Sequence, residues 1–348
     1  MKKLFPYFIG IVAAVCGATA AVTLNWPIPY LLGALLFCAA LNLSGCTIKP
    51  VPFGREMGLL IIGASLGLYF TPSMMALLVA NWIWLLASAV FSIWLGVQGT
   101  YLLQKWAGAD FETAWFASGV GGASEMAYMA DKTSARTDWV VAAQALRVLM
   151  VAATVPTAYH FLGLHGYDDT VLDKNPLIHY GGLLALFGLA FVGVWLFRWR
   201  RWSNPWTFGP LLAVLLLTAG EIHLSAMPDY LSNLGQMLLG LALGSKFQKG
   251  FFGKAPRFLA VMAANIVLGL LWTALLAYLL SQISGLSAAS IGLGLAPGGV
   301  AEMTVTAKVL HLGVPLVTVF HVCRMVAVIY SSGRMRLWFK PFLERKRR

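Results

Sequence analysis

A duplicated motif limits what this chain can fold into more than any other feature of its sequence. The segment GVGGASEM at residues 119–126 is followed, at an offset of 177 residues (302 − 125), by APGGVAEM at residues 296–303. The same offset relates pairs of identical residues: Glu125 and Glu302, Arg147 and Arg324, Gly58 and Gly235, Gly63 and Gly240, and Gly67 and Gly244. The sequence therefore predicts two homologous repeats.

The low charge content indicates the environment of these repeats. Of the 348 residues, 59% are hydrophobic and only 11% are charged, whereas soluble globular proteins are about 25% charged. Several apolar runs approach the ~20 residues that a helix needs to cross a bilayer. The first run follows Lys2 and Lys3 and resembles a signal peptide, but it is long enough to span, so we expect a retained first helix. The sequence thus predicts an all-α polytopic membrane protein.

The positive net charge does not indicate nucleic-acid binding. The net charge is +12, and the basic residues cluster in short segments between apolar runs, for example at residues 198–201, 246–257 and 334–348. Clusters of this kind are typical of cytoplasmic loops that face anionic lipid. The lipid bilayer is therefore the expected partner, and direct nucleic-acid binding is not expected.

The basic clusters also predict the topology. They lie on the cytoplasmic side if each repeat has about five transmembrane helices plus one re-entrant or broken helix that carries the Gly-Gly-Glu-Met motif. An odd number of crossings gives the second repeat inverted topology, as in many secondary transporters. We expect a first repeat at 1–164, a polar connector at 165–180 and a second repeat at 181–348 that ends in a short basic tail. Both termini are then cytoplasmic.

Two short glycine-rich segments, near 58–70 and 235–247, have 13 residues within these bounds and fall short of the ~17 that a membrane crossing requires. Their glycines have the small-xxx-small spacing that lets helices pack closely. The alternative is a discontinuous or tilted helix beside a substrate path.

Glu125 and Glu302 are the candidate functional carboxylates, because an ionised side chain in hydrocarbon costs at least ~2.5 kcal/mol. A glycine pair precedes each of them and allows a break in the backbone, which must then line a protein-enclosed cavity. If a helix begins after the glycines, each Glu lies in its first turn, where the helix dipole stabilises an anion. The two roles considered are ion, proton or substrate contact, and a structural ion pair. The glycines are Gly121 and Gly122, and Gly298 and Gly299.

Arg147 and Arg324 lie in the middle of the apolar segments that follow the motifs. The simplest partner of each is the Glu of its own repeat, since Arg and carboxylate form bidentate pairs. The alternative is that one Arg binds an anionic substrate. Gln144 and His321 lie three residues before the arginines, on the same helical face. They are interpreted as packing residues, and a proton carrier is the alternative role of His321.

The two copies differ in polarity. Ser124 and Tyr128 occur in the first copy, where the second has Ala301 and Val305. We expect the more polar copy to contribute more to binding, and Glu125 to be the more sensitive carboxylate.

No catalytic or metal signature accompanies these residues. His160, His165 and His179 surround the connector without zinc or copper spacing. We expect no enzyme activity, no catalytic residues, no metal site and no cofactor.

The duplicated GG-x-x-EM motifs and the matching arginines resemble the bacterial membrane AbrB-duplication family, whose members contain two copies of one membrane unit. The resemblance covers nearly the whole chain and implies a multi-pass protein of the bacterial cytoplasmic (inner) membrane. Members carry the names regulator of gene expression and ammonia monooxygenase. Neither activity follows from these residues, because the sequence provides neither a DNA-reading element nor an oxygenase metal site.

The leading functional hypothesis is a secondary transporter or permease for a small polar or anionic solute, with ion or proton coupling through the intramembrane Glu residues. The second is a membrane-bound regulator that affects gene expression indirectly, and the third is a membrane oxygenase. The sequence leaves the substrate, the coupling ion and a homo-oligomer open.

Overall fold

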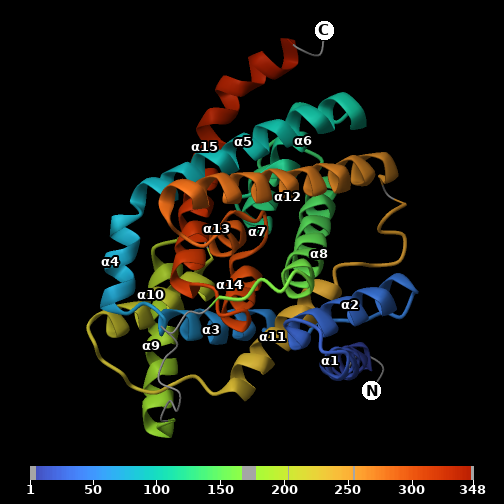
Figure 1. Ribbon diagram of the computed structural model, residues 1–348. Helices are drawn as coiled ribbons and strands as arrows, with labels where there is room; N and C mark the ends of the chain where they lie inside the picture. The colour runs from blue at the N-terminus through green and yellow to red at the C-terminus, as the bar shows by residue number, and fades with distance from the viewer. Residues whose placement is uncertain (1–4, 167–177, 203, 254, 346–348) are drawn as a thin grey trace. The chain divides into compact units, whose positions relative to one another are not determined.

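The structure, a computed structural model, describes residues 5–166, 178–202, 204–253 and 255–345 (Figure 1). The elements assigned to these residues are α-helices, as the all-α prediction requires. The first half contains α1 (Phe5–Thr23), α2 (Pro29–Leu43), α3 (Gly54–Gly67), α4 (Pro72–Ala80), α5 (Trp82–Ala107), α6 (Phe111–Ser118), α7 (Ala123–Asp131) and α8 (Thr137–Phe161). The second half contains α9 (Tyr180–Trp199), α10 (Pro205–Ala219), α11 (Asp229–Gly244), α12 (Pro256–Ser284), α13 (Ala288–Leu295), α14 (Val300–Val309) and α15 (Val314–Arg345).

Six of the described helices are long and apolar enough to cross a membrane: α1, α5, α8, α9, α12 and the Val314–Gly333 part of α15. A seventh candidate is the pair α3 and α4, which is bent by 87°. The helices α2 and α10 are apolar but have only 15 residues each, below the ~17 that a crossing requires. A multi-pass membrane protein is thus confirmed, and five crossings per repeat stays a prediction.

The helix bounds follow the spacing of the duplicated motifs. The helix α6 begins and ends 177 residues before α13, since Phe111 corresponds to Ala288 and Ser118 to Leu295. The first residues of α7 and α14, and those of α8 and α15, are related by the same offset. The helix α4 is the exception, because its offset position is 249–257 and the described helices there cover only the first two residues of α12.

The chain forms two compact units, and each takes segments from both halves of the sequence. Unit 1 comprises Met1–Ala80, Pro156–Lys249 and Thr304–Leu316. Unit 2 comprises Asn81–Val155, Gly250–Met303 and Val317–Arg348. The sequence boundaries at 164 and 181 stay a prediction, and residues 167–177 of the connector lie outside the described residues.

The core of unit 1 consists of two similar clusters, in which a helix from one half packs on a helix pair from the other. One cluster joins α1 and α2 to α11, and the other joins α9 and α10 to α3. The helices α3 and α11 pack against each other, and a Cβ on Gly58 would lie 2.8 Å from the carbonyl oxygen of Gly235. Since a Cβ cannot approach so closely, the glycines here serve close helix packing, as one of the two predictions held. The bend between α3 and α4 is also in keeping with the other prediction, a discontinuous helix.

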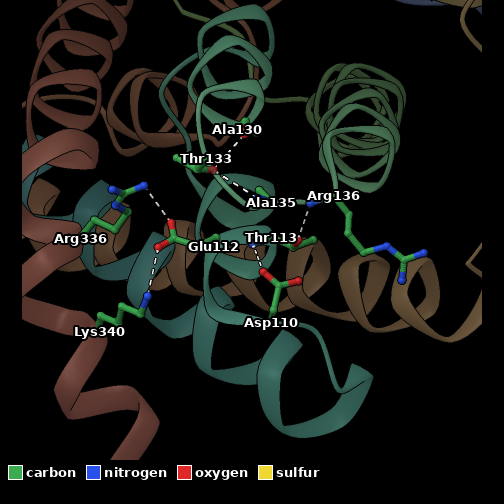
Figure 2. Close-up of polar contacts among 9 residues, drawn as sticks. All are labelled: Asp110, Glu112, Thr113, Ala130, Thr133, Ala135, Arg136, Arg336 and Lys340. Carbon is green, nitrogen blue, oxygen red and sulfur yellow. Dashed lines mark hydrogen bonds and ion pairs between the residues drawn. The ribbon is translucent and has the colours of Figure 1, made fainter.

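In unit 2, the long helices α5 and α12 pack against each other, and each packs on a short helix, α6 or α13. Figure 2 shows how α15 is joined to α6: the Glu112 carboxylate accepts hydrogen bonds from Arg336 at 2.9 Å and Lys340 at 3.5 Å. Asp110 caps α6 by accepting from the Thr113 backbone N–H at 2.9 Å. These contacts fix the helix that leads into the first motif.

Candidate functional site

Both motifs lie in unit 2 at breaks between two short helices. In the first break α6 ends at Ser118 and α7 begins at Ala123, and in the second α13 ends at Leu295 and α14 begins at Val300. Gly122 precedes α7 with a φ of 103°, a conformation that is essentially restricted to glycine. Glu125 and Glu302 each lie in the first turn of the helix that follows, as predicted.

The packing within each break explains the sequence Gly-Gly-x-x-Glu-Met. Met126 and Met303 are fully buried, and a Cβ added to Gly121 or Gly298 would crowd the methionine of its own motif. A Cβ on Gly299 would overlap the carboxylate of Glu302. The first glycine therefore makes room for the methionine, and the second makes room for the Glu302 carboxylate at the start of α14, where the helix dipole favours an anion.

The two arginines hold the ends of the helices that precede the breaks. Arg147 donates a hydrogen bond from Nη1 to the carbonyl oxygen of Gly119 at 2.6 Å. Arg324 donates from Nη1 to the corresponding carbonyl of Ala296 and from Nη2 to that of Gly298 at 2.7 Å. Both side chains are buried, and carbonyl oxygens at a helix C-terminus have no partner within the helix. Each guanidinium thus satisfies backbone groups that the break exposes.

The expected pairing of each Arg with the Glu of its own repeat has a different standing in the two copies. Among the described residues, no ion pair joins Glu125 to Arg147, and the ion pairs of Glu112 with Arg336 and Lys340 lie on α6 and α15. The pairing of Glu302 with Arg324 stays a prediction. The charge of Glu302 also acts on Arg147, from the other half of the sequence. The charge of Arg147 also acts on Arg324. Unit 2 therefore brings two guanidinium groups and one carboxylate together.

Gln144 and His321 support the same loops as the arginines. The Gln144 side-chain amide donates to the carbonyl oxygens of Phe116, Ala117 and Gly119 at 2.8, 3.1 and 3.0 Å. The His321 Nε2 atom lies 3.0 Å from the carbonyl oxygen of Leu293, the counterpart of Phe116. Both side chains are buried, which is in keeping with the packing role considered for His321.

The surroundings of the two carboxylates differ in burial. Glu302 is 8% exposed, whereas Glu125 is half-buried. Tyr128 is 59% exposed, and the Lys132 ammonium lies 4.1 Å from its ring centroid. The side chain of Ser124 lies outside the described residues. Burial and charge thus concentrate at the second carboxylate rather than at the first, more polar copy.

A cavity in unit 2 reaches both breaks. Val120 of the first break and Pro297 of the second line it, together with Arg147, Ser118 and Asn265. It contains about 310 Å³ of empty space, its open side included. Asn265 was not among the residues predicted from the sequence. The signal that could have found it is an amide well inside the 29-residue apolar helix α12, whose other amide, Gln282, lies near the C-terminal end.

A second cavity, with about 250 Å³ of empty space including its open side, lies against the first break. It contacts Gly119 and is lined by the hydroxyl-bearing residues Ser92, Ser331 and Ser332. The segment 118–120 therefore contacts two cavities, and Arg147 lines one of them. Broken helices beside a protein-enclosed cavity are typical of intramembrane solute sites.

Comparisons with known proteins identify the family. A sequence profile of the family described as "Transition state regulatory protein AbrB" matches residues 30–340. "Uncharacterized protein YhjN" of Bacillus subtilis (strain 168) is 26% identical over 293 residues, which cover 78% of this chain and 75% of that protein. "Putative regulator AbrB" of Escherichia coli (strain K12) is 23% identical over 330 residues, 93% of this chain and 94% of that protein. Because the profile extends over most of a chain rich in membrane-spanning helices, this protein is an integral membrane member of the AbrB family.

Proposed function

We propose that this protein is a secondary transporter or permease for a small polar or anionic solute, with ion or proton coupling through Glu302 and Glu125. The observation that carries the proposal is the cavity of unit 2, where a buried Arg147 and residues from both helix breaks meet. Ionisable groups within membrane helices are costly and usually mark substrate or ion pathways. Helix breaks with N-termini at the site are the usual binding elements of secondary transporters.

Two inverted homologous repeats are part of this proposal. The equal offsets of the helix bounds support them, and so do the equivalent contacts of Arg147 with Gly119 and Arg324 with Ala296. In such an architecture each repeat supplies one helix break to a shared site, and rocking of the repeats exposes it alternately.

The proposed topology places both termini in the cytoplasm and the polar connector outside. It rests on the positive-inside rule. Single cysteines at Asp169 and Gly333, in a variant without the native cysteines, are expected to differ: only the cysteine at 169 should react with an impermeant thiol reagent in intact cells. Equal labelling of both positions excludes this topology.

The transport proposal is tested with purified protein in proteoliposomes. A thermal-shift screen against small metabolites first identifies a solute that stabilises the folded state. Wild-type protein should then accumulate that solute when a proton or ion gradient is imposed, and Glu302→Gln, which keeps the shape but cannot ionise, should not. Gradient-independent wild-type flux, or an unchanged rate in Glu302→Gln, contradicts the coupling role.

The alternative is a membrane-bound regulator that acts on gene expression indirectly. The family description and the name of the Escherichia coli relative, which speak of regulation, favour it. Both proposals hold if the transported solute is itself an effector that changes gene expression. The discriminating experiment compares transcripts in cells that carry wild-type protein or folded Glu302→Gln. An expression change that persists when transport is lost favours the regulator.

A further inference from the structure

We propose that the cavity of unit 2 binds the carboxylate group of a small monocarboxylate, with Arg147 and Asn265 as the recognising side chains. This inference rests on the proposed transport function and names its substrate class. Three features of the cavity support it: the free edge of one guanidinium, an amide without a partner and the balance of charge.

The Arg147 guanidinium is anchored on one side only. Nη1 donates to the Gly119 carbonyl, while the buried Nε has no hydrogen-bond partner among the described residues. An unpartnered buried donor costs free energy, which a ligand can recover. The edge of a guanidinium that carries Nε matches two oxygens in one plane, as in a carboxylate. The hydrogen bond from Nη1 to Gly119 fixes the plane of the guanidinium before the ligand binds.

Asn265 lies at the cavity without a hydrogen bond to any other described residue, although it is half-buried in an apolar helix. The helix α5 makes room for it: a Cβ on Gly99 would lie 2.7 Å from the Asn265 Nδ2 atom. A primary amide both donates and accepts. It can therefore donate to a ligand carboxylate that also contacts Arg147.

The charges favour a single anionic group. Arg147 is the one charged residue among the described residues that line the cavity, and Arg324 and Glu302 act from nearby. If these three groups are ionised, their sum is one positive charge, which one carboxylate neutralises. The rest of the lining includes Leu95, Met262 and Ile266, which suit a short apolar body. An inorganic anion would leave these side chains without a partner.

The test measures binding of radiolabelled propionate to purified protein in nanodiscs, with unlabelled propionamide and chloride as competitors. Propionamide has nearly the same shape as propionate but no charge. Chloride has the charge but lacks the two coplanar oxygens of a carboxylate. Propionate is expected to compete at least about tenfold better than either. Asn265→Leu and Arg147→Lys should each weaken binding about tenfold or more. The matched control Thr273→Val, on the same helix but not among the residues that line the cavity, should bind as wild type does.

The outcomes separate this inference from the proposed function. Equal competition by propionamide, or undiminished binding in folded Asn265→Leu, overturns the carboxylate site. If propionate does not bind while wild-type proteoliposomes accumulate another solute in a Glu302-dependent way, the substrate class is wrong and transport stands. If propionate binds but no gradient drives its uptake, the site stands and transport is wrong. The propionate and propionamide comparison needs only wild-type protein, so it holds even where Arg147→Lys does not fold.

Discussion

The two helix breaks of unit 2 share a backbone design and differ in their charges. In both, a buried arginine donates to the carbonyl that ends the preceding helix, and a buried methionine packs on a glycine. The helix before the first break forms an ion-pair contact with α15, because Glu112 of α6 pairs with Arg336 and Lys340. The corresponding residue of α13 is Ala289, which has no charge to form such a pair. The second break instead contains the more buried carboxylate, Glu302. The comparison teaches that one backbone framework can hold different charges in its two copies, and the proposed function assigns solute binding to the first break and the change of charge to the second.

The largest expected effect comes from the arginines. Arg324→Met removes two hydrogen bonds from a charged donor, and the Ala296 carbonyl keeps only the backbone N–H of Gly298, so we expect a loss of about 2–4 kcal/mol in the free energy of unfolding. Arg147→Met removes one such bond and should cost about 1–3 kcal/mol. Unfolding titrations in mild detergent measure both. A larger loss in Arg147→Met than in Arg324→Met breaks the comparison.

Gln144 and His321, three residues before the arginines, are expected to have the next largest effect on the free energy of unfolding. Gln144→Leu removes the side-chain donor of three carbonyl oxygens, of which that of Gly119 keeps Arg147, whereas His321→Leu affects one described contact. We expect a loss of about 1–3 kcal/mol for Gln144→Leu and a smaller loss for His321→Leu. The ratio of the two, measured under one set of conditions, tests whether the first break depends more on hydrogen bonds from α8. Equal losses contradict this asymmetry.

The second glycine of each motif, Gly122 or Gly299, is expected to have a different role in the two breaks. Gly299→Ala should displace the Glu302 carboxylate, so its cost should largely vanish in a Glu302→Ala background, with a coupling energy of about 0.5–3 kcal/mol. Gly122→Ala strains the backbone itself, at about 1–3 kcal/mol, and should cost the same in a Glu125→Ala background. Two double-mutant cycles measure these energies. Coupling in the first break, or none in the second, overturns the assigned roles of the glycines.

The smallest effect is expected at the outer ion pair. Glu112→Gln should lower the free energy of unfolding by about 1 kcal/mol, because Arg336 and Lys340 are partly solvated. The loss should shrink at high salt, which screens the interaction. Ala289→Gln at the corresponding place in the second half serves as the control, since no ion pair exists there to be lost. A salt-independent loss argues that Glu112 acts through packing rather than charge.

The sequence predicted the features that depend on local chemistry. A glycine pair before a Glu-Met predicts a backbone break with the carboxylate in the next first turn, and α7 and α14 begin where the glycines end. The apolar runs likewise predicted membrane helices. The polarity of Ser124 and Tyr128 favoured Glu125 as the sensitive site, and the burial of Glu302 now moves our expectation to the second carboxylate.

The backbone partners of the arginines could not be predicted from side-chain chemistry. A sequence displays a carboxylate as an obvious counterion, but it does not display a carbonyl oxygen such as that of Gly119, exposed by the end of a helix. The two units could not be predicted for a related reason: they interleave segments from both halves of the chain. Asn265 becomes informative only when α5 and α12 bring it to the cavity.

The central claim is that Glu302 changes charge during transport while Arg147 holds the solute. It is tested by comparing gradient-driven accumulation with solute exchange in proteoliposomes, using the solute that wild-type protein accumulates. Exchange of labelled for unlabelled solute requires binding and reorientation but no release of the coupling ion. We predict that Glu302→Gln keeps exchange and loses accumulation, that Arg147→Lys loses both, and that Glu125→Gln is less affected than Glu302→Gln. Wild-type accumulation by Glu302→Gln, or loss of exchange in that variant together with accumulation, would contradict the account.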